Sequence, residues 1–199
     1  MIALDCEMSG LKPHLNSILS LGAVDMSNPS NTFYDECRVW EGAHISDEAL
    51  EVNGFTKEQI TDVNKKSESE MIKAFVLWAS AIEGDRTFVG QNVAIDRDFV
   101  EEACDRADIE FPFAHRSLDT HTLAFMHMTK KGIVLPVVNH RSVLNLDAIL
   151  SYCGIPEEPK PHNALTGAKC HAEVAARLLY GKQLLSEFSS YEVPKNLLA

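Results

Sequence analysis

The pattern of apolar and polar positions predicts four strands in the first half of the chain. Residues 2–8 are apolar up to their first acid, which is typical of a buried strand. Residues 17–26 and 32–40 follow after short turns, so we expect an antiparallel meander of three strands. A further apolar run, residues 86–90, predicts a fourth, buried strand.

Much of the remaining chain has the periodicity of amphipathic helices. Helices are expected at residues 44–50, from residue 56, and at residues 67–83, 93–107, 120–128, 144–153 and 163–188. Residues 129–143 have no such period, and we expect an irregular segment there. Three strands, helices, a strand and more helices, in that order, predict an α/β fold with a mixed sheet.

Length and composition fit one globular domain. The 199 residues are 45% hydrophobic, which is enough for a substantial core, so we predict a single domain over residues 1–199. No apolar run is long enough to span a membrane, and no basic segment precedes a cleavage site. Five scattered cysteines fit free thiols better than a disulfide framework. Together these features predict a cytoplasmic protein that does not enter membranes.

The charge balance restricts the partners. Lys and Arg number 18 against 29 Asp and Glu residues, a net charge of -11. Coating a long duplex requires many phosphate contacts from basic side chains, so the balance argues against that role. It leaves open a grip on a few nucleotides at a strand end. One stretch is locally basic, with Lys130, Lys131, His140 and Arg141, and either a solvated loop or a contact with an incoming strand explains it.

Two carboxylates on the first strand carry the first chemical signal. Asp5 and Glu7 are two residues apart, and strand geometry places them on one face. Adjacent carboxylates beside a core repel each other and are costly to bury. A divalent cation that prefers oxygen ligands, Mg²⁺ or Mn²⁺, removes that cost. On this spacing alone, two solvated acids on an edge strand are an equal alternative.

Further segments decide between these alternatives. Residues 5–26 read DCEMSGLKPHLNSILSLGAVDM, residues 53–56 read NGFT, residues 90–99 read GQNVAIDRDF, and residues 162–165 read HNAL. In this order and spacing, the chain resembles the DnaQ-like 3′–5′ exonucleases of the DEDDh type. The resemblance covers nearly the whole chain. It implies a ribonuclease H-like α/β fold, with a mixed β-sheet flanked by helices.

The resemblance also implies phosphodiester hydrolysis with two divalent metal ions, Mg²⁺ or Mn²⁺, roughly 3.5–4 Å apart. Asp5 would bridge both ions, and Glu7 and Asp96 would complete the two metal sites. His162 would be the general base that accepts a proton from the attacking water. It follows the proline-rich linker at residues 157–161, so we expect it on a mobile loop over the site.

A place for the 3′-terminal nucleotide follows from the same resemblance. The residues concerned are Met8, Ser9, Gly10, Leu11, Asn92 and Phe99. The first three would offer main-chain contacts, since glycine permits close approach of the backbone. The leucine would wedge against the terminal base, and the last two would shape the nucleotide pocket. For each of them, an ordinary role as a turn, cap or core residue is an equal alternative.

One position departs from the family pattern. The family's fourth acid lies five residues after the histidine, where this chain has Gly167. His171 lies one turn further, only ~40° around the helix, and is one candidate for the missing metal ligand, with a bias toward Mn²⁺. Glu173 lies about 120° away and is a poor substitute. Alternatively, water fills the gap, because Mg²⁺ readily keeps several waters. In a third interpretation, the site is degenerate and binds ends without cutting them.

The expected function is therefore a metal-dependent 3′–5′ exonuclease that degrades single-stranded DNA or RNA, or short oligonucleotides, to mononucleotides. The alternative is a catalytically weakened relative that binds nucleic-acid 3′ ends. The complete set of Asp5, Glu7, Asp96 and His162 favours the enzyme, and Gly167 favours the alternative. The sequence leaves open the choice between DNA and RNA. It also leaves open whether the chain forms a homodimer or joins a polymerase.

Overall fold

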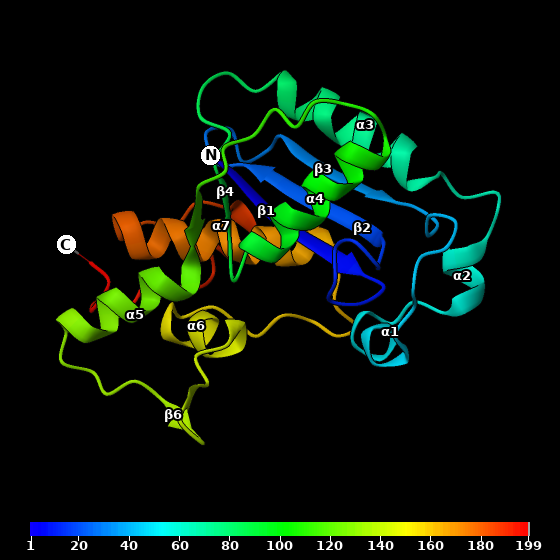
Figure 1. The fold of residues 1–199 in the computed structure, drawn as a ribbon. Helices are drawn as coiled ribbons and strands as arrows, with labels where there is room; N and C mark the ends of the chain where they lie inside the picture. Colours follow the sequence, from blue (N-terminus) through cyan, green and yellow to red (C-terminus); the bar gives the residue numbers. More distant parts are fainter. Residues whose placement is uncertain (199) are drawn as a thin grey trace.

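The computed structural model describes residues 1–198 and contains a five-stranded mixed sheet (Figure 1). The strands are β1 (Ile2–Met8), β2 (Ile18–Asp25), β3 (Thr32–Glu36), β4 (Phe88–Gly90) and β5 (Ser117–Asp119). Their order across the sheet is β3-β2-β1-β4-β5. The pairs β1/β2 and β2/β3 are antiparallel, and β1/β4 and β4/β5 are parallel. The predicted α/β fold with a mixed sheet is confirmed.

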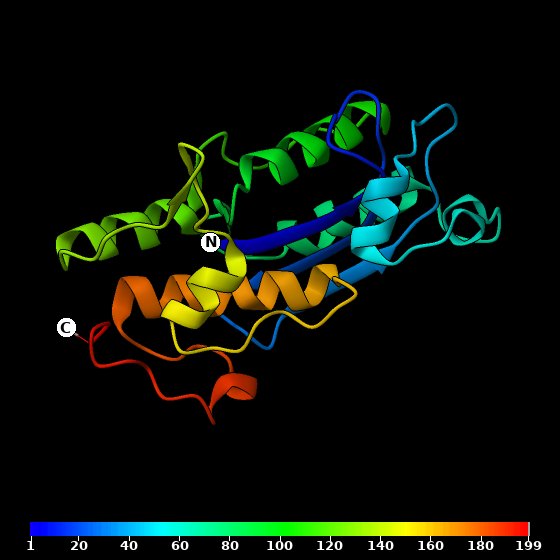
Figure 2. The same cartoon turned by 90° about the horizontal axis from the view of Figure 1, so that it is seen from below.

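Helices cover both faces of this sheet (Figures 1 and 2). They are α1 (Asp47–Asn53), α2 (Lys57–Thr61), α3 (Glu68–Ser80), α4 (Ala94–Arg106), α5 (Thr120–Lys130), α6 (Leu146–Tyr152) and α7 (Ala164–Tyr180). One hydrophobic core joins α3 and α4 to the sheet, and a second core joins α5, α6 and α7 to its other face. None of the helices within residues 1–198 combines the length and the apolar character that a bilayer crossing requires.

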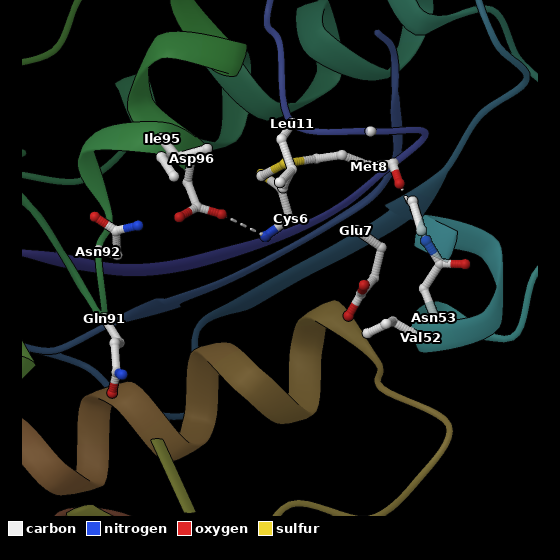
Figure 3. A pocket seen from close by; sticks show the side chains of 12 residues that line it. Cys6, Glu7, Met8, Leu11, Val52, Asn53, Gln91, Asn92, Ile95 and Asp96 are labelled. Carbon is white, nitrogen blue, oxygen red and sulfur yellow. Dashed lines mark hydrogen bonds between the residues drawn. The ribbon is translucent and has the colours of Figure 1, made fainter. Parts of the chain in front are cut away.

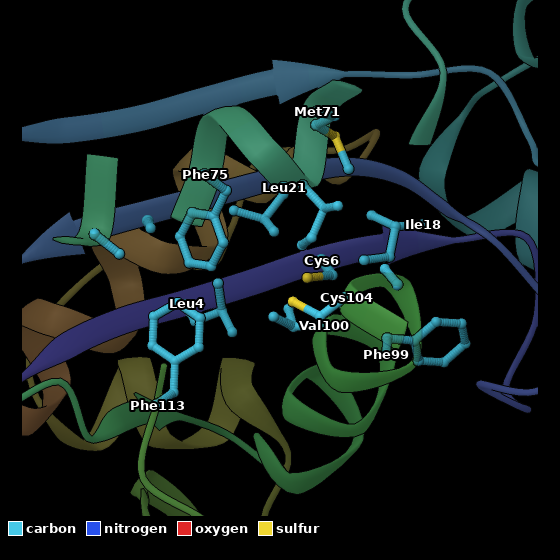
Figure 4. Packing of buried hydrophobic residues seen from close by; sticks show 14 of the residues in the cluster. Leu4, Cys6, Ile18, Leu21, Met71, Phe75, Phe99, Val100, Cys104 and Phe113 are labelled. Atoms are coloured by element: carbon cyan, nitrogen blue, oxygen red, sulfur yellow. The ribbon is translucent and has the colours of Figure 1, made fainter. Parts of the chain in front are cut away.

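Alternation along β1 assigns its side chains to these two faces. Leu4 and Cys6 lie in the core beneath α3 and α4 (Figure 4). Ala3 belongs to the second core, beneath α5, α6 and α7. Because successive side chains of a strand point to opposite faces, Asp5 and Glu7 share the face that α7 covers.

Helix α7 lies directly on the sheet at its N-terminal end. Gly22 of β2 permits this contact, since a Cβ atom there would overlap the backbone of Ala164. The inward face of α7 is built from small buried residues, among them Ala168, Ala172 and Ala175. The close packing brings the first turns of α7 up to the carboxylates of β1.

The last helix is shorter than the predicted 163–188. It ends at Tyr180, and Gly181 follows in the left-handed conformation with φ of 60°, where its N–H caps the helix. The chain then turns back. The backbone N–H groups of Leu184 and Leu185 donate to the buried carboxylate of Glu173 instead of continuing the helix.

Two other predictions were wrong in detail. The third strand was expected to reach residue 40, but it ends at Glu36, because the Arg38 N–H bonds to Lys66 and draws the chain away from β2. Residues 129–143 contain a small hairpin of β6 (Val137–Val138) and β7 (Arg141–Ser142). Strand β5 was not foreseen either, because three half-buried residues show too little periodicity.

Candidate active site

The site begins where β1 loses a neighbour. Strand β4 ends at Gly90, so the second half of β1 has no strand partner on that edge. The first turn of α4 takes its place. There, Oδ1 of Asp96 accepts a hydrogen bond of 3.0 Å from the backbone N–H of Cys6 (Figure 3). Asp96 is only 7% exposed, and it brings a third carboxylate to the end of β1 that carries Asp5 and Glu7.

Asp5 meets α7 on the other side of the strand. Its Oδ1 lies 3.5 Å from Nε2 of His171, and its side chain is 23% exposed. Gly167 leaves the room for this carboxylate, because a Cβ at that position would lie 2.7 Å from Cγ of Asp5. Position 167, where the family has its fourth acid, is thus occupied by a glycine that makes room for the side chain of Asp5.

The carboxylates of this cluster are held away from water. Burial raises the pKa of Asp5 well above its ordinary value, and the charge of Glu158 adds to the effect. Burial, followed by the charges of Asp5, Glu158 and Asp96, raises the pKa of Glu7 to about 8. Burial and the Asp5 charge also raise the pKa of Asp96. Such a cluster favours either protons or a bound cation.

The donor set suits a hard divalent cation. Carboxylate oxygens are the ligands that Mg²⁺ and Mn²⁺ prefer. Within residues 1–198, Asp5, Glu7 and Asp96 form no ion pair with a lysine or arginine, and His171 Nδ1 is buried without a hydrogen-bond partner. In the same part of the chain, no three Asp, Glu, His or Cys side chains already lie close enough to hold an ion. A cation would therefore require these side chains to rotate toward one another.

An open pocket of about 270 Å³ adjoins the carboxylates (Figure 3). Met8 at the end of β1 lines it together with Gly10 and Leu11 of the following turn, and Leu11 is 80% exposed. Asn92 lines it from the turn before α4. The structure thus brings four of the six residues expected near the terminal nucleotide to one pocket beside Glu7 and Asp96.

The other two lie elsewhere. Phe99 is fully buried in the core beneath α3 and α4, so it supports α4 and does not line the pocket (Figure 4). Ser9 is also buried, and its hydroxyl donates to the carbonyl of His44 and accepts from the N–H of Ser17. These two bonds fix the turn that carries Met8 and Gly10.

The turn before α4 is fixed from β5. Asn92 has a positive φ of 53°, a conformation that asparagine tolerates better than most residues. Its N–H donates to Oδ2 of Asp119 at 2.6 Å, and Oδ1 of Asp119 accepts from Thr122 N–H as the cap of α5. Asp119 therefore both caps α5 and fixes the turn at Asn92.

His162 occupies the loop before α7, as expected from the sequence. It lines a second hollow of about 200 Å³, together with Ser20 and Asn53. Ser20 is the partner of Glu7 across the β1/β2 pair, and Asn53 donates to the carbonyl of Met8. His162 thus lines a different hollow from the pocket beside Glu7 and Asp96, and within residues 1–198 it forms no ion pair with these carboxylates.

One acidic residue of the site was missed. Glu158 falls in the segment interpreted as a rigid linker, yet it is only 6% exposed, and its Oε1 has no hydrogen-bond partner within residues 1–198. Burial raises its pKa, while the charges of His162 and His171 oppose that shift. Two adjacent glutamates among prolines show no periodicity, so only the missing acid at position 167 gave reason to search for another one.

The fold is that of the ribonuclease H-like exonucleases. The chain belongs to the RNase T exonuclease family, whose model matches residues 2–175. The resemblance to DnaQ-like exonucleases of the DEDDh type is thereby confirmed. No curated protein sequence matches the chain.

Solved structures of low sequence identity share the fold. The nuclease domain of 3′hExo, a DEDDh family member bound to rAMP, aligns with a TM-score of 0.68 and 17% identity over 92% of this chain and 93% of that one. E. coli exonuclease I in complex with a dA16 oligonucleotide aligns with a TM-score of 0.67 and 16% identity, over 89% of this chain and 40% of that one. Cell-death related nuclease 4 aligns with a TM-score of 0.69 and 13% identity, over 92% of this chain and 64% of that one. This chain thus spans about two-fifths of exonuclease I.

Proposed function

We propose that the protein is a metal-dependent 3′–5′ exonuclease that removes mononucleotides from single-stranded DNA or RNA, including short oligonucleotides. One observation carries the proposal: the buried carboxylates of Glu7 and Asp96 line an open pocket on an exonuclease fold, and the partly exposed Asp5 lies beside Glu7 on the same face of β1. Their raised pKa values fit a site built for cations. A divalent cation bound there supplies Lewis-acid activation and charge neutralisation at the scissile phosphate.

The chain's own residues would then divide the remaining work. Asp5, Glu7 and Asp96 hold the cations. A ring nitrogen of His162 accepts the proton of the attacking water, which requires its loop to move toward the carboxylates. Met8 and Leu11 hold the last nucleotide in the pocket.

The type of substrate is inferred from the relatives. Exonuclease I has been captured with single-stranded oligonucleotides, and the 3′hExo domain with a mononucleotide. The pocket beside Glu7 is at the small end of the range for ligand sites, which suits one terminal nucleotide. The net charge of -11 also favours a grip on a strand end over a grip on a long strand.

The test is degradation of a 5′-labelled single strand, DNA and RNA in parallel, with Mg²⁺ or Mn²⁺. A 3′–5′ enzyme gives a ladder of shrinking labelled products, whereas attack from the 5′ end releases the label at once. Asp96→Asn should reduce the rate at least ~100-fold, the scale of losing a group that stabilises the transition state. Asp98→Asn on the same helix is the control, because Asp98 pairs with Arg97, and its rate should stay within a few fold.

The second candidate is a module that binds 3′ ends without cutting them, and Gly167 is the observation that favours it. In that case the wild-type chain would retain a labelled strand in a filter or gel-shift assay, yet would give no ladder with either metal. Retention should be lost when the 3′ end carries a bulky blocking group. A ladder in the degradation assay would exclude this candidate.

A further inference from the structure

Glu158 is a buried acid for which the fold provides no complete set of partners. It lies in the loop between α6 and α7 with 6% of its surface exposed. Its Oε1 is buried without a hydrogen-bond partner within residues 1–198. Burying a carboxylate without partners is costly, and buried polar atoms in folded proteins are otherwise almost always paired. The side chain therefore points to a ligand.

The loop that carries Glu158 is fastened after it. Pro161 packs on Gly54 at the end of α1, where a Cβ atom would lie 2.7 Å from the Cβ of the proline. Asn163 caps α7, and its Nδ2 donates to the hydroxyl of Tyr34 at 3.2 Å. Figure 2 shows this segment, coloured yellow to orange, running beside α7 toward α1. These contacts hold Glu158 on the face of the sheet that carries Asp5 and Glu7.

Electrostatic effects agree with a position of Glu158 near the carboxylates of β1. After burial, its charge is the main cause of the raised pKa of Asp5, and it also raises the pKa of Glu7. His162 and His171 act on Glu158 in turn. The path of the chain gives the same position, because this loop leads into the start of α7, where Ala164 packs on Gly22, the β2 partner of Asp5.

Helix α7 cannot supply the family's fourth acid in this arrangement. Any side chain at position 167 would place its Cβ against the carboxylate of Asp5. His171 Nε2 lies beside Asp5, and Glu173 is committed to Arg177 and to the backbone of Leu184 and Leu185. Glu158, at the loop that leads into α7, has no such commitment, because its buried Oε1 has no hydrogen-bond partner within residues 1–198.

We propose that Glu158 is the carboxylate that replaces the missing fourth acid, and that it binds the second divalent cation together with Asp5. In this chain the fourth acid is supplied by the loop before α7 and not by α7 itself. Gly167 provides the space for Asp5 to turn toward Glu158. His171 is then a positioning residue beside Asp5 and not a ligand. The inference rests on the proposed function, because it assigns a ligand to the same metal site.

The test is a titration of the metal-free protein with Mn²⁺ in the absence of nucleic acid. Binding is monitored by calorimetry and by the electron paramagnetic resonance signal of free Mn²⁺. Wild type should bind two ions. Glu158→Gln should weaken one site at least tenfold and leave the other unchanged. Glu157→Gln, at the exposed neighbouring position, is the matched control and should titrate as wild type. His171→Gln should change the affinity less than Glu158→Gln does.

Thermal unfolding provides a second readout. Glu158→Gln removes a buried charge, so the metal-free variant should unfold at the same temperature as wild type or above it. The rise in Tm on adding Mn²⁺ should be smaller in Glu158→Gln than in wild type and Glu157→Gln. A titration and a Tm rise equal to those of wild type would overturn the inference.

The outcomes separate this inference from the proposed function. If wild type degrades the labelled strand while Glu158→Gln binds Mn²⁺ as wild type does, the exonuclease stands and the role of Glu158 falls. If Mn²⁺ binding depends on Glu158 but wild type gives no ladder, the ligand stands and the exonuclease falls. If wild type binds no Mn²⁺, both fall.

Discussion

The fold treats the acids near α7 in opposite ways: Glu173 in the middle of the helix has a full set of partners, and the carboxylates near the end of β1 do not. Glu173, in the middle of α7, is fully buried, and its Oε1 accepts from Nε of Arg177 at 2.7 Å. Its Oε2 accepts the backbone N–H groups of Leu184 and Leu185 at 2.9 and 2.8 Å. Arg177, also fully buried, donates its remaining N–H groups to the backbone carbonyl of Cys153 and to carbonyls of the C-terminal segment.

At the start of α7 the picture is reversed. Asp5, Glu7, Asp96 and Glu158 share one neighbourhood, and burial is the first cause of the raised pKa of each. Within residues 1–198 none of them pairs with a lysine or arginine. The same chain thus provides complete partners for an acid whose role is structural and withholds them from a second group. Buried polar groups in folded proteins are normally paired, and ionisable groups with shifted pKa values cluster at functional sites. A group of acids without such partners therefore indicates a ligand-binding site.

The sharpest way to break this comparison is to remove the partner of the satisfied acid. Arg177→Met leaves the charge of Glu173 buried and unpaired, which should cost ~3–5 kcal/mol of unfolding free energy. In a chain of this size that corresponds to a fall in Tm of roughly 6–20 °C. Urea or thermal unfolding of the metal-free protein measures it.

The control uses an ion pair at the surface. Lys169 and Glu187 lie 2.9 Å apart but remain partly exposed, so Lys169→Met should cost no more than ~1 kcal/mol. A loss below ~1 kcal/mol in Arg177→Met as well would mean that Glu173 does not depend on its partner. The contrast between the two acid groups would then disappear.

The fold could be predicted from the sequence wherever the periodic pattern of apolar and polar residues was long enough to be recognised. The meander of β1, β2 and β3 and the amphipathic α3 and α4 have such periods, and they lie where expected. What failed depended on tertiary contacts. Strand β5 has three residues, and the premature end of α7 depends on Gly181 and on the distant carboxylate that captures the following N–H groups.

The site divides in the same way. Spacing within one strand brought Asp5 and Glu7 together, and the motif around Asp96 located a third acid. Phe99 was misplaced, because a helical position next to a site residue can face the core as easily as the pocket. Glu158 was invisible, because its proximity to Asp5 arises only when the loop before α7 folds against α1.

A second, smaller effect should appear in the dependence of stability on pH. Glu7 has an ordinary pKa of 4.5 and a folded pKa of about 8. Between these values the folded chain keeps a proton that the unfolded chain has released, so stability falls as the pH rises from about 5 to 8. Even ~2 kcal/mol of loss would lower the Tm of the metal-free protein by roughly 4–8 °C.

Two comparisons isolate this effect from other titrating groups. Glu7→Gln cannot ionise, so its Tm should fall less than that of wild type over the same pH range. Mn²⁺ needs deprotonated carboxylates, and it should therefore raise the Tm of wild type more at pH 8 than at pH 5. Parallel Tm curves for wild type and Glu7→Gln would show that Glu7 is ionised in the folded protein throughout.

Gly167→Ala should have the smallest effect on the free energy of unfolding, yet it should clearly weaken metal binding. Alanine favours the helix by up to about 1 kcal/mol, but its Cβ would press on the Asp5 carboxylate, which is the flexible end of a side chain and can move. The free energy of unfolding should therefore change by less than ~1 kcal/mol.

The displacement of Asp5 should nevertheless weaken Mn²⁺ binding several-fold, because Asp5 is the acid common to both proposed metal sites. Thr166→Ala is the control, since it adds no atom near Asp5 and should leave the titration unchanged. An unchanged titration in Gly167→Ala would show that the carboxylate of Asp5 binds metal from a position that does not depend on the glycine. In that case the glycine is required only for the metal-free packing of Asp5, and the space at position 167 has no part in the metal site.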